Sequence, residues 1–194
     1  MSATQAGSPR RLPLAILISG RGSNMAAILE AARDPDYPAS PVLVLSNRPG
    51  APGLQTAAGH GVATATVDHK AYGSDREAFE REVDRHLSAH GAELVALAGF
   101  MRVLTPWFVR RWSGRLVNIH PSLLPKYRGL DTHARALEAG EPVAGCSVHF
   151  VTEGVDEGEV IAQAEVPVLP GDTPDRLAER VLVHEHRLYP DAVA

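Results

Sequence analysis

Residues 13–33, PLAILISGRGSNMAAILEAAR, decide the fold predicted for this chain. Residues 13–20 form a short apolar run that ends in glycine, which is typical of a buried parallel strand. Residues 24–33 place apolar side chains at helical spacing. A buried strand that passes through a glycine-containing turn into a helix begins a βαβ unit, so the stretch predicts an α/β protein.

The same alternation of apolar runs and helical patterns continues through the first half of the chain. It predicts strands at 41–47, 62–67 and 93–99, and helices at 53–61 and 74–91. In the second of these helices Ser74 is the predicted N-cap, and Glu77 completes a capping box. Alternating strands and helices predict parallel βαβ units with right-handed crossovers.

The rhythm changes in the second half of the chain. Helices are predicted at 105–114, 132–140 and 173–194, and a strand at 115–120. The stretch 145–168 predicts two antiparallel strands joined by an acidic, glycine-containing loop. Thr173 is the predicted cap of the last helix, with Pro174 in its first turn. The expected fold is therefore a mixed, mostly parallel central sheet flanked by helices.

Composition limits the classes of function. The chain has 194 residues, of which 44% are hydrophobic, with a net charge of −4 and a pI near 6.1. This balance argues against nucleic-acid binding, although a local basic pocket can still hold a phosphorylated metabolite. The sequence has no apolar run long enough to span a membrane, and its first residues do not form a secretory signal. We therefore expect a cytoplasmic protein. We expect a flexible tail at 1–11 and one domain at 12–194.

The turn SGRGSN, residues 19–24, is the first candidate site. It follows a strand and opens a helix, where the amides of Gly22, Ser23 and Asn24 favour a bound phosphate. A Walker ending and the third glycine of a dinucleotide fingerprint are both absent from the turn, which favours a monophosphate. The alternative is an ordinary strand-to-helix turn.

Asn118 and His120 form the second candidate site, at the end of the strand predicted over 115–120. Residues two apart in a strand share one face, so both side chains are predicted at the sheet edge where α/β proteins bind ligands. Histidine can exchange a proton near neutral pH, and an asparagine amide can donate to an oxyanion. Asp156, in a glycine-flanked loop, is placed to reach the histidine. A structural histidine and a solvated acidic turn remain open alternatives.

Histidine and cysteine are two other residue types in the chain that can carry chemistry. The nine histidines show no recognised metal-ligand spacing, so we expect no metal. The single cysteine, Cys146, is interpreted as a small buried residue rather than a reactive thiol.

Six blocks of sequence together resemble the 10-formyltetrahydrofolate-dependent formyltransferase family, in particular its glycinamide ribonucleotide branch. They cover most of residues 12–190 and read LISGRGSN, SNRPGAPGL, ALAGFMRVLTPWF, NIHPSLLPKYRGLDTHARALEAG, GCSVHFVTEGVDEGEVIAQAEVPV and EHRLYP. The resemblance implies a Rossmann-like formyltransferase fold. It also implies transfer of the formyl group of 10-formyltetrahydrofolate to the amine of N1-(5-phospho-D-ribosyl)glycinamide, in de novo purine (IMP) biosynthesis.

The resemblance also assigns residues to roles. It makes Asn118, His120 and Asp156 catalytic, and it implies a nucleotide-binding half over 12–100 and a folate-binding, catalytic half over 101–194. The implied contacts of the substrate phosphate and ribose are Gly22, Ser23, Asn24 and Glu185. The implied folate contacts are Arg76, Met101, Arg102, Val103, Leu104 and Val155. Ser147 and His149 are expected to support the active-site loop, and Lys126 and Arg128 to be surface charges on it.

Several alternatives stay open from the sequence. A formyltetrahydrofolate hydrolase shares the catalytic block, but usually carries a further N-terminal regulatory domain. A methionyl-tRNA formyltransferase would need a C-terminal RNA-binding domain and a basic surface. A non-catalytic nucleotide- or folate-binding module is a third reading. Family members usually continue past the final Tyr-Pro into short strands, which are not predicted here, and the chain is expected to be a monomer or a homodimer.

Overall fold

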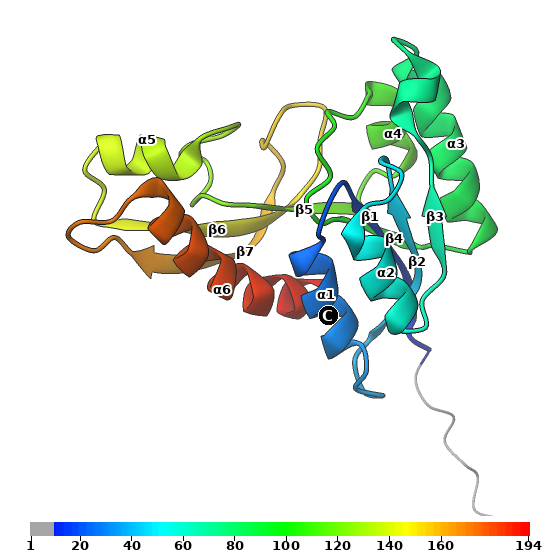
Figure 1. Cartoon of the computed structure of the whole chain (residues 1–194), viewed down its shortest axis with the longest axis horizontal. Coiled ribbons are helices and arrows are strands. Elements are labelled where there is room, and N and C mark those ends of the chain that lie inside the picture. The colour runs from blue at the N-terminus through cyan, green and yellow to red at the C-terminus, as the bar shows by residue number, and fades with distance from the viewer. Residues whose placement is uncertain (1–9) are drawn as a thin grey trace, which may run out of the picture.

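The computed structural model describes residues 10–194, so most of the tail predicted at 1–11 lies outside the described residues. Its elements are β1 (Leu12–Ile18), α1 (Ser23–Ala31), β2 (Ala39–Ser46), α2 (Pro52–Gly59), β3 (Thr64–Thr66), a 3₁₀ helix (His69–Tyr72), α3 (Arg76–Ala89), β4 (Leu94–Leu97), α4 (Pro106–Arg111), β5 (Leu116–His120), α5 (Thr132–Glu138), β6 (Val143–Phe150), β7 (Val160–Pro167) and α6 (Pro174–Val193). Figure 1 shows β1–β4 with their helices on one side of the molecule and β6, β7, α5 and α6 on the other.

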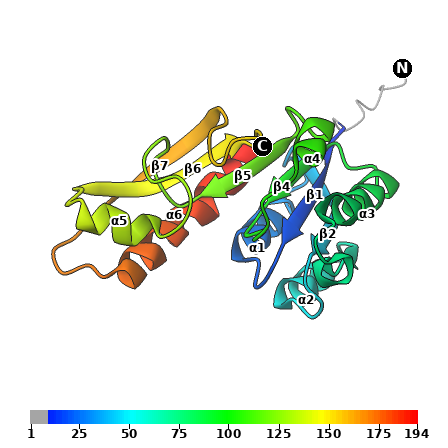
Figure 2. The same cartoon turned by 90° about the horizontal axis from the view of Figure 1, so that it is seen from above.

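A single seven-stranded sheet runs through the described part of the chain, in the order β3-β2-β1-β4-β5-β6-β7. In this sheet order, β3, β2, β1, β4 and β5 are parallel to one another. Strand β6 is antiparallel to β5, and β7 is antiparallel to β6. The predicted α/β fold with a mixed, mostly parallel sheet is therefore confirmed. Figure 2 shows the sheet from above, with α6 running along β6 and β7.

Helices cover both faces of the sheet. One core cluster joins α1 and the C-terminal part of α6 to the sheet, through side chains such as Met25, Ile28 and Tyr189. A second cluster joins α3 and α4 to the opposite face, through Phe79 and Phe108 among others. The strands β1 and β4 contribute to both clusters, because alternate side chains of a strand point to opposite faces. This double covering explains why the central strands read as continuous apolar runs.

Two sequence predictions about local structure need correction. The predicted capping box of α3 is wrong, because Asp75 rather than Ser74 is the N-cap, and its Oδ1 accepts from the amide of Ala78 at 2.9 Å. The helix predicted at 74–91 is observed over Arg76–Ala89, so the residue directly before its first turn is Asp75. The strand predicted at 62–67 shortens to Thr64–Thr66, because it is an edge strand that pairs only with β2.

Other local predictions are confirmed. The hydroxyl of Thr173 accepts from the amide of Arg176 at 3.3 Å and caps α6 as expected. Cys146 is fully buried in β6, and burial raises the pKa of its thiol to about 12, which fits a structural residue. Arg11 is a different case, because it falls within the tail predicted at 1–11 and yet donates to the backbone carbonyls of Ala32 and Ala39.

Candidate active site

The sheet has a topological switch point between β1 and β4. From β1 the chain builds β2 and β3 on one side, and it then crosses to build β4 on the other. Ligands of open α/β sheets bind at the carboxyl ends of the strands where the order reverses. A pocket of about 230 Å³ lies there, and it is lined by Ser19–Asn24, Arg48, Ala98, Gly99 and Met101.

The turn SGRGSN forms one wall of this pocket, as the prediction for Gly22, Ser23 and Asn24 requires. Gly22 is the N-cap of α1 with a φ of 65°, a left-handed conformation that favours glycine. The amide of Gly53, at the start of α2, donates to Gly20 at 3.1 Å, and a Cβ at Gly53 would lie 2.6 Å from the Ile18 side chain. The close backbone contact with Gly53 therefore fixes the turn, and the first amides of α1 lie at the pocket.

Two arginines that line the pocket, Arg21 and Arg48, were not predicted from the sequence. Arg21 lies within the turn itself, and Arg48 follows β2 at the same edge of the sheet. The hydroxyl of Ser46 accepts from the Arg48 amide at 3.0 Å and donates to the Arg48 carbonyl, which fixes the backbone there. The available signal was the position of Arg48 directly after a parallel strand, since such strand ends meet at one edge. Both guanidinium groups add positive charge to a pocket in a chain of net negative charge.

Glu185 of α6 meets the same turn from the other side. Its Oε2 accepts from Nδ2 of Asn24 at 2.7 Å, although the two residues lie near opposite ends of the chain. Burial raises the pKa of Glu185, while the hydrogen bond from Asn24 and the nearby His120 lower it. Oδ1 of Asn24 is buried and has no hydrogen-bond partner within residues 10–194. The side chain of Asn24, which lines the pocket, is therefore held by a carboxylate from the last helix.

His120 ends β5 and contacts Asp156 as predicted. Nδ1 of His120 lies 3.3 Å from Oδ2 of Asp156, and both side chains are largely buried. Nε2 of His120 lies 3.0 Å from the carbonyl oxygen of Tyr127. Both ring nitrogens therefore lie within 3.3 Å of an oxygen atom that can accept a hydrogen bond.

His149 is the partner of Asn118. The two residues are paired across β5 and β6, and Nδ2 of Asn118 lies 3.3 Å from Nε2 of His149. Nδ1 of His149 donates to the Phe150 carbonyl at 2.8 Å, which leaves Nε2 to accept from the amide. Burial lowers the pKa of His149, while this hydrogen bond and Asp156 raise it, so we assign the neutral ring. Oδ1 of Asp156 lies 3.6 Å from Nε2 of His149.

The loop after His120 is tied to the sheet by a buried serine. The hydroxyl of Ser147 accepts from the amide of Leu124 at 3.0 Å and donates to the carbonyl of Ser122 at 2.6 Å. Ser147 therefore supports this loop, as expected. Lys126 and Arg128 pair with Glu141 and Glu157 respectively on exposed parts of the loop, which confirms that they are surface charges.

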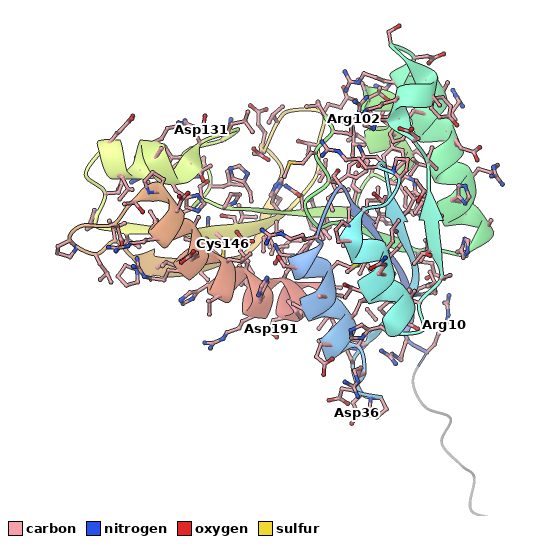
Figure 3. All side chains as sticks on the ribbon, in the orientation of Figure 1. Arg10, Asp36, Arg102, Asp131, Cys146 and Asp191 are labelled. Carbon is pink, nitrogen blue, oxygen red and sulfur yellow. The ribbon has the colours of Figure 1, made fainter. Side chains whose placement is uncertain are left out.

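The remaining expected contacts lie on two loops beside α3 and α4. Three large apolar side chains are exposed there, with exposed fractions of 69% for Met101, 65% for Val103 and 54% for Val155. The guanidinium of Arg102 lies 5.7 Å from the ring centre of Phe79. Figure 3 labels Arg102 beside the helices α3 and α4, and Asp131 next to α5, in the part of the molecule that holds α5 and α6.

Arg76 and Leu104 complete the residues expected around the folate. Arg76, the first residue of α3, donates to the carbonyl of Val103. Leu104 is half-buried against the core cluster of α3 and α4. Two loops of exposed apolar side chains with arginines beside them suit a flat aromatic ligand that carries an anionic tail.

The described residues show neither a metal-binding cluster nor a membrane-spanning helix. Residues 10–194 contain no group of three or more His, Cys, Asp or Glu side chains arranged to hold a metal ion. Among the helices of this same region, none combines the length and apolar character that crossing a membrane requires.

Comparison with known proteins identifies the family of the chain. The formyl transferase family model matches residues 12–193. Phosphoribosylglycinamide formyltransferase of Escherichia coli is 48% identical over 177 residues, which cover 91% of this chain and 83% of the relative. The trifunctional purine biosynthetic protein adenosine-3 of Drosophila melanogaster is 52% identical over 96% of this chain, although the chain spans only 14% of that relative.

Solved structures agree with this relationship. Glycinamide ribonucleotide transformylase 1 of Symbiobacterium toebii superposes with a TM-score of 0.93 at 44% identity, over 98% of this chain and 90% of the other. Phosphoribosylglycinamide formyltransferase of Brucella melitensis gives a TM-score of 0.90 at 49% identity, over 94% of each chain. The chain therefore belongs to the formyl transferase family.

Proposed function

We propose that this chain transfers the formyl group of 10-formyltetrahydrofolate to the amine of N1-(5-phospho-D-ribosyl)glycinamide, in de novo purine biosynthesis. The products are the N-formyl compound and tetrahydrofolate. The observation that carries this proposal is the cluster formed by His120, Asp156 and the Asn118–His149 pair, together with the pocket of about 230 Å³ at the switch point of the sheet. The family and the relatives with this activity support the same conclusion.

Each half of the domain binds mainly one of the two substrates in this proposal. In the proposed arrangement, residues 12–100 hold the nucleotide, with its phosphate on the amides of Gly22–Asn24 and its ribose hydroxyls on Glu185 from the other half. Residues 101–194 hold the folate, between Met101–Leu104 with Arg76 and the loop that contains Val155. Holding both substrates in one orientation accounts for much of the rate, because it replaces an encounter of two molecules by a reaction within one complex.

Asn118 and His120 stabilise the charge that develops during the transfer. When the amine nitrogen bonds to the formyl carbon, the formyl oxygen becomes an oxyanion. The amide of Asn118 has a second hydrogen besides the one directed at His149, and it donates to this oxyanion. Nε2 of His120 donates as well, which requires it to exchange the carbonyl of Tyr127 for the substrate.

Asp156 keeps the imidazolium of His120 oriented and moves a proton. The attacking amine loses a proton and N10 of the folate gains one as the C–N10 bond breaks, so the proton balance closes within the site. Asp156 relays this proton, directly or through water. The step needs neither a covalent enzyme intermediate nor a metal ion. We propose that the protein acts in the cytoplasm.

An assay of formyl loss with and without the nucleotide tests the proposal. The purified chain is mixed with 10-formyltetrahydrofolate, and tetrahydrofolate formation is followed by absorbance. Turnover that requires N1-(5-phospho-D-ribosyl)glycinamide is the expected result. Equal turnover in its absence would identify a hydrolase, and no turnover in either case would indicate a binding module.

A further inference from the structure

The segment Met101–Thr105 is fastened at both ends by buried polar side chains. At its start, the amide of Met101 donates to the hydroxyl of Ser19 at 2.8 Å. At its end, the amide of Thr105 donates to Oε1 of Glu80 at 2.7 Å, and the Thr105 hydroxyl donates to Oε2 of the same carboxylate. The four residues proposed to contact the folate, Met101–Leu104, therefore lie between two fixed points.

Glu80 is an unusual residue for the inward face of a helix. It lies on α3, next to Phe79 in the core, and only 2% of its surface is exposed. Burying a carboxylate is unfavourable unless hydrogen bonds compensate it. Within residues 10–194, the hydrogen bonds to this carboxylate come from Thr105 alone. Burial raises the pKa of Glu80, while the two hydrogen bonds from Thr105 and the charge of Arg76 lower it.

Thr105 occupies the N-cap position of α4, but its hydroxyl does not cap that helix. The hydroxyl and the amide both turn to Glu80 instead, so that α3 determines where α4 begins. A carboxylate at this position also complements the positive end of α4. One turn earlier on α3, Arg76 donates to the carbonyl of Val103. The helix α3 therefore holds the segment at Val103 and Thr105, while Ser19 holds it at Met101.

We propose that Glu80 is a positioning residue for folate recognition. By holding Thr105 it fixes Arg102–Leu104 in place, and it contacts neither substrate itself. This inference rests on the proposed function, because it concerns the segment assigned there to the folate. Loss of Glu80 leaves Met101 attached to Ser19, which is next to the nucleotide pocket. The effect is therefore confined to the folate.

Three variants of α3 test the role by steady-state kinetics and by calorimetric titration with tetrahydrofolate. Glu80→Ala is expected to raise the KM for 10-formyltetrahydrofolate and the Kd for tetrahydrofolate about tenfold, since two hydrogen bonds to a charged group are lost. Its KM for the nucleotide should stay within about twofold of the wild-type value. Glu80→Gln should restore the folate KM, because its oxygen still accepts from the Thr105 amide and its nitrogen can donate to the hydroxyl.

Glu77→Ala is the matched control for loss of a carboxylate from the same helix. Glu77 is exposed and pairs with Arg81 at 2.6 Å, away from Met101–Thr105, so both KM values should be unchanged. If Glu80→Ala does not fold, Thr105→Val removes one of the two bonds and should raise the folate KM about threefold.

Two results would overturn the inference, and they differ from a failure of the proposed function. A folate KM and tetrahydrofolate Kd unchanged in Glu80→Ala, measured with an active wild type, refute the positioning role alone. An equal rise in the KM for both substrates refutes it too, because it indicates general loosening of the fold. A wild-type chain that transfers no formyl group contradicts the proposed function instead.

Discussion

Oδ2 of Asp156 lies 3.3 Å from Nδ1 of His120, although the aspartate belongs to the loop between β6 and β7 and the histidine ends β5. The same carboxylate also accepts from the amide of Gly129 at 2.9 Å, and its other oxygen lies 3.6 Å from His149. Asp156 thus connects the loop that follows His120 to the strand that carries His149. This relationship makes the Asp156 loop the most sensitive part of the proposed active site.

Removing the charge of Asp156 should slow formyl transfer strongly. Asp156→Asn keeps the size of the side chain but loses the negative charge beside His120 and can no longer accept a proton. We expect kcat to fall by about 10²–10³, with smaller changes in both KM values. Stopped assays of the N-formyl product at saturating substrates measure this.

Glu157→Gln is the control for this variant, because Glu157 lies in the same loop but pairs with Arg128 on the surface. It should keep a kcat within about twofold of the wild-type value. A kcat for Asp156→Asn as high as that of the control would contradict the assignment of Asp156.

The Asp156 loop can also be displaced without touching a proposed catalytic side chain. A Cβ at Gly158 would lie 1.7 Å from the carbonyl oxygen of Phe150, a backbone atom that cannot move aside. Gly158→Ala should therefore shift the loop and lower kcat about tenfold or more, because small misplacements of catalytic groups are costly. Circular dichroism and kcat measured on one preparation separate local displacement from unfolding.

Gly59→Ala provides the matching glycine control. Gly59 is the last residue of α2, and no heavy atom lies within 4 Å of the position that a Cβ would take. We expect unchanged kcat and a free energy of unfolding raised by up to about 1 kcal/mol. If both glycine variants lose activity equally, the close contact at Gly158 is not the cause.

The ionised carboxylate of Glu185 should lower the free energy of unfolding while it strengthens nucleotide binding. Burial raises the pKa of Glu185, so its contribution to stability is present below the unfolded pKa and is lost as the pH rises through the folded one. Glu185→Gln cannot ionise, so its free energy of unfolding should exceed that of the wild type by about 1 kcal/mol at pH 8. Urea titrations should show this difference shrinking as the pH falls toward 4.5, the ordinary value for glutamate.

The same Glu185→Gln variant should bind the nucleotide more weakly. Its KM for N1-(5-phospho-D-ribosyl)glycinamide should rise about tenfold, because hydrogen bonds to a charged acceptor are stronger than those to an amide. Glu179→Gln, an exposed change on the same helix, should alter neither quantity. A lower free energy of unfolding for Glu185→Gln than for the wild type at pH 8 would contradict the prediction, because it would show that the ionised carboxylate does not destabilise the fold.

Arg48 should strengthen binding of the substrate phosphate. Arg48→Ala removes one of two guanidinium groups from the pocket and should raise the KM for the nucleotide about tenfold, without changing the KM for the folate. The effect should weaken with added salt, because Arg48 is exposed and its charge is screened. Arg33→Ala, which removes an exposed arginine just beyond α1, should have no such effect.

The sequence predicted the order of the elements well because local patterns encode it. The strand and helix of residues 13–33 carry both the apolar period and the glycine turn that end one element and start the next. Predictions failed where two adjacent residues competed for one role, as Ser74 and Asp75 did at the start of α3. They also failed at β3, because the extent of an edge strand depends on its one partner strand.

The candidate site was predictable where neighbouring residues act together, as in the pair Asn118 and His120 on one strand face. Contacts between distant segments were harder to foresee. Glu80 reads in the sequence as one more charged residue of a surface helix, yet it is buried against Thr105. Arg48 gave only the weak signal of following a strand.

The sequence by itself determined the α/β alternation, the glycine turn at the switch-point pocket and the strand that carries His120, because propensity and periodicity act over short distances. Only the tertiary structure decided which side chains meet across those elements. The antiparallel pairing of β5 with β6 places His149 opposite Asn118, and the packing of α6 against α1 brings Glu185 to Asn24. These contacts depend on how whole elements pack, since burial of their apolar faces fixes the distances between polar groups far apart in the chain.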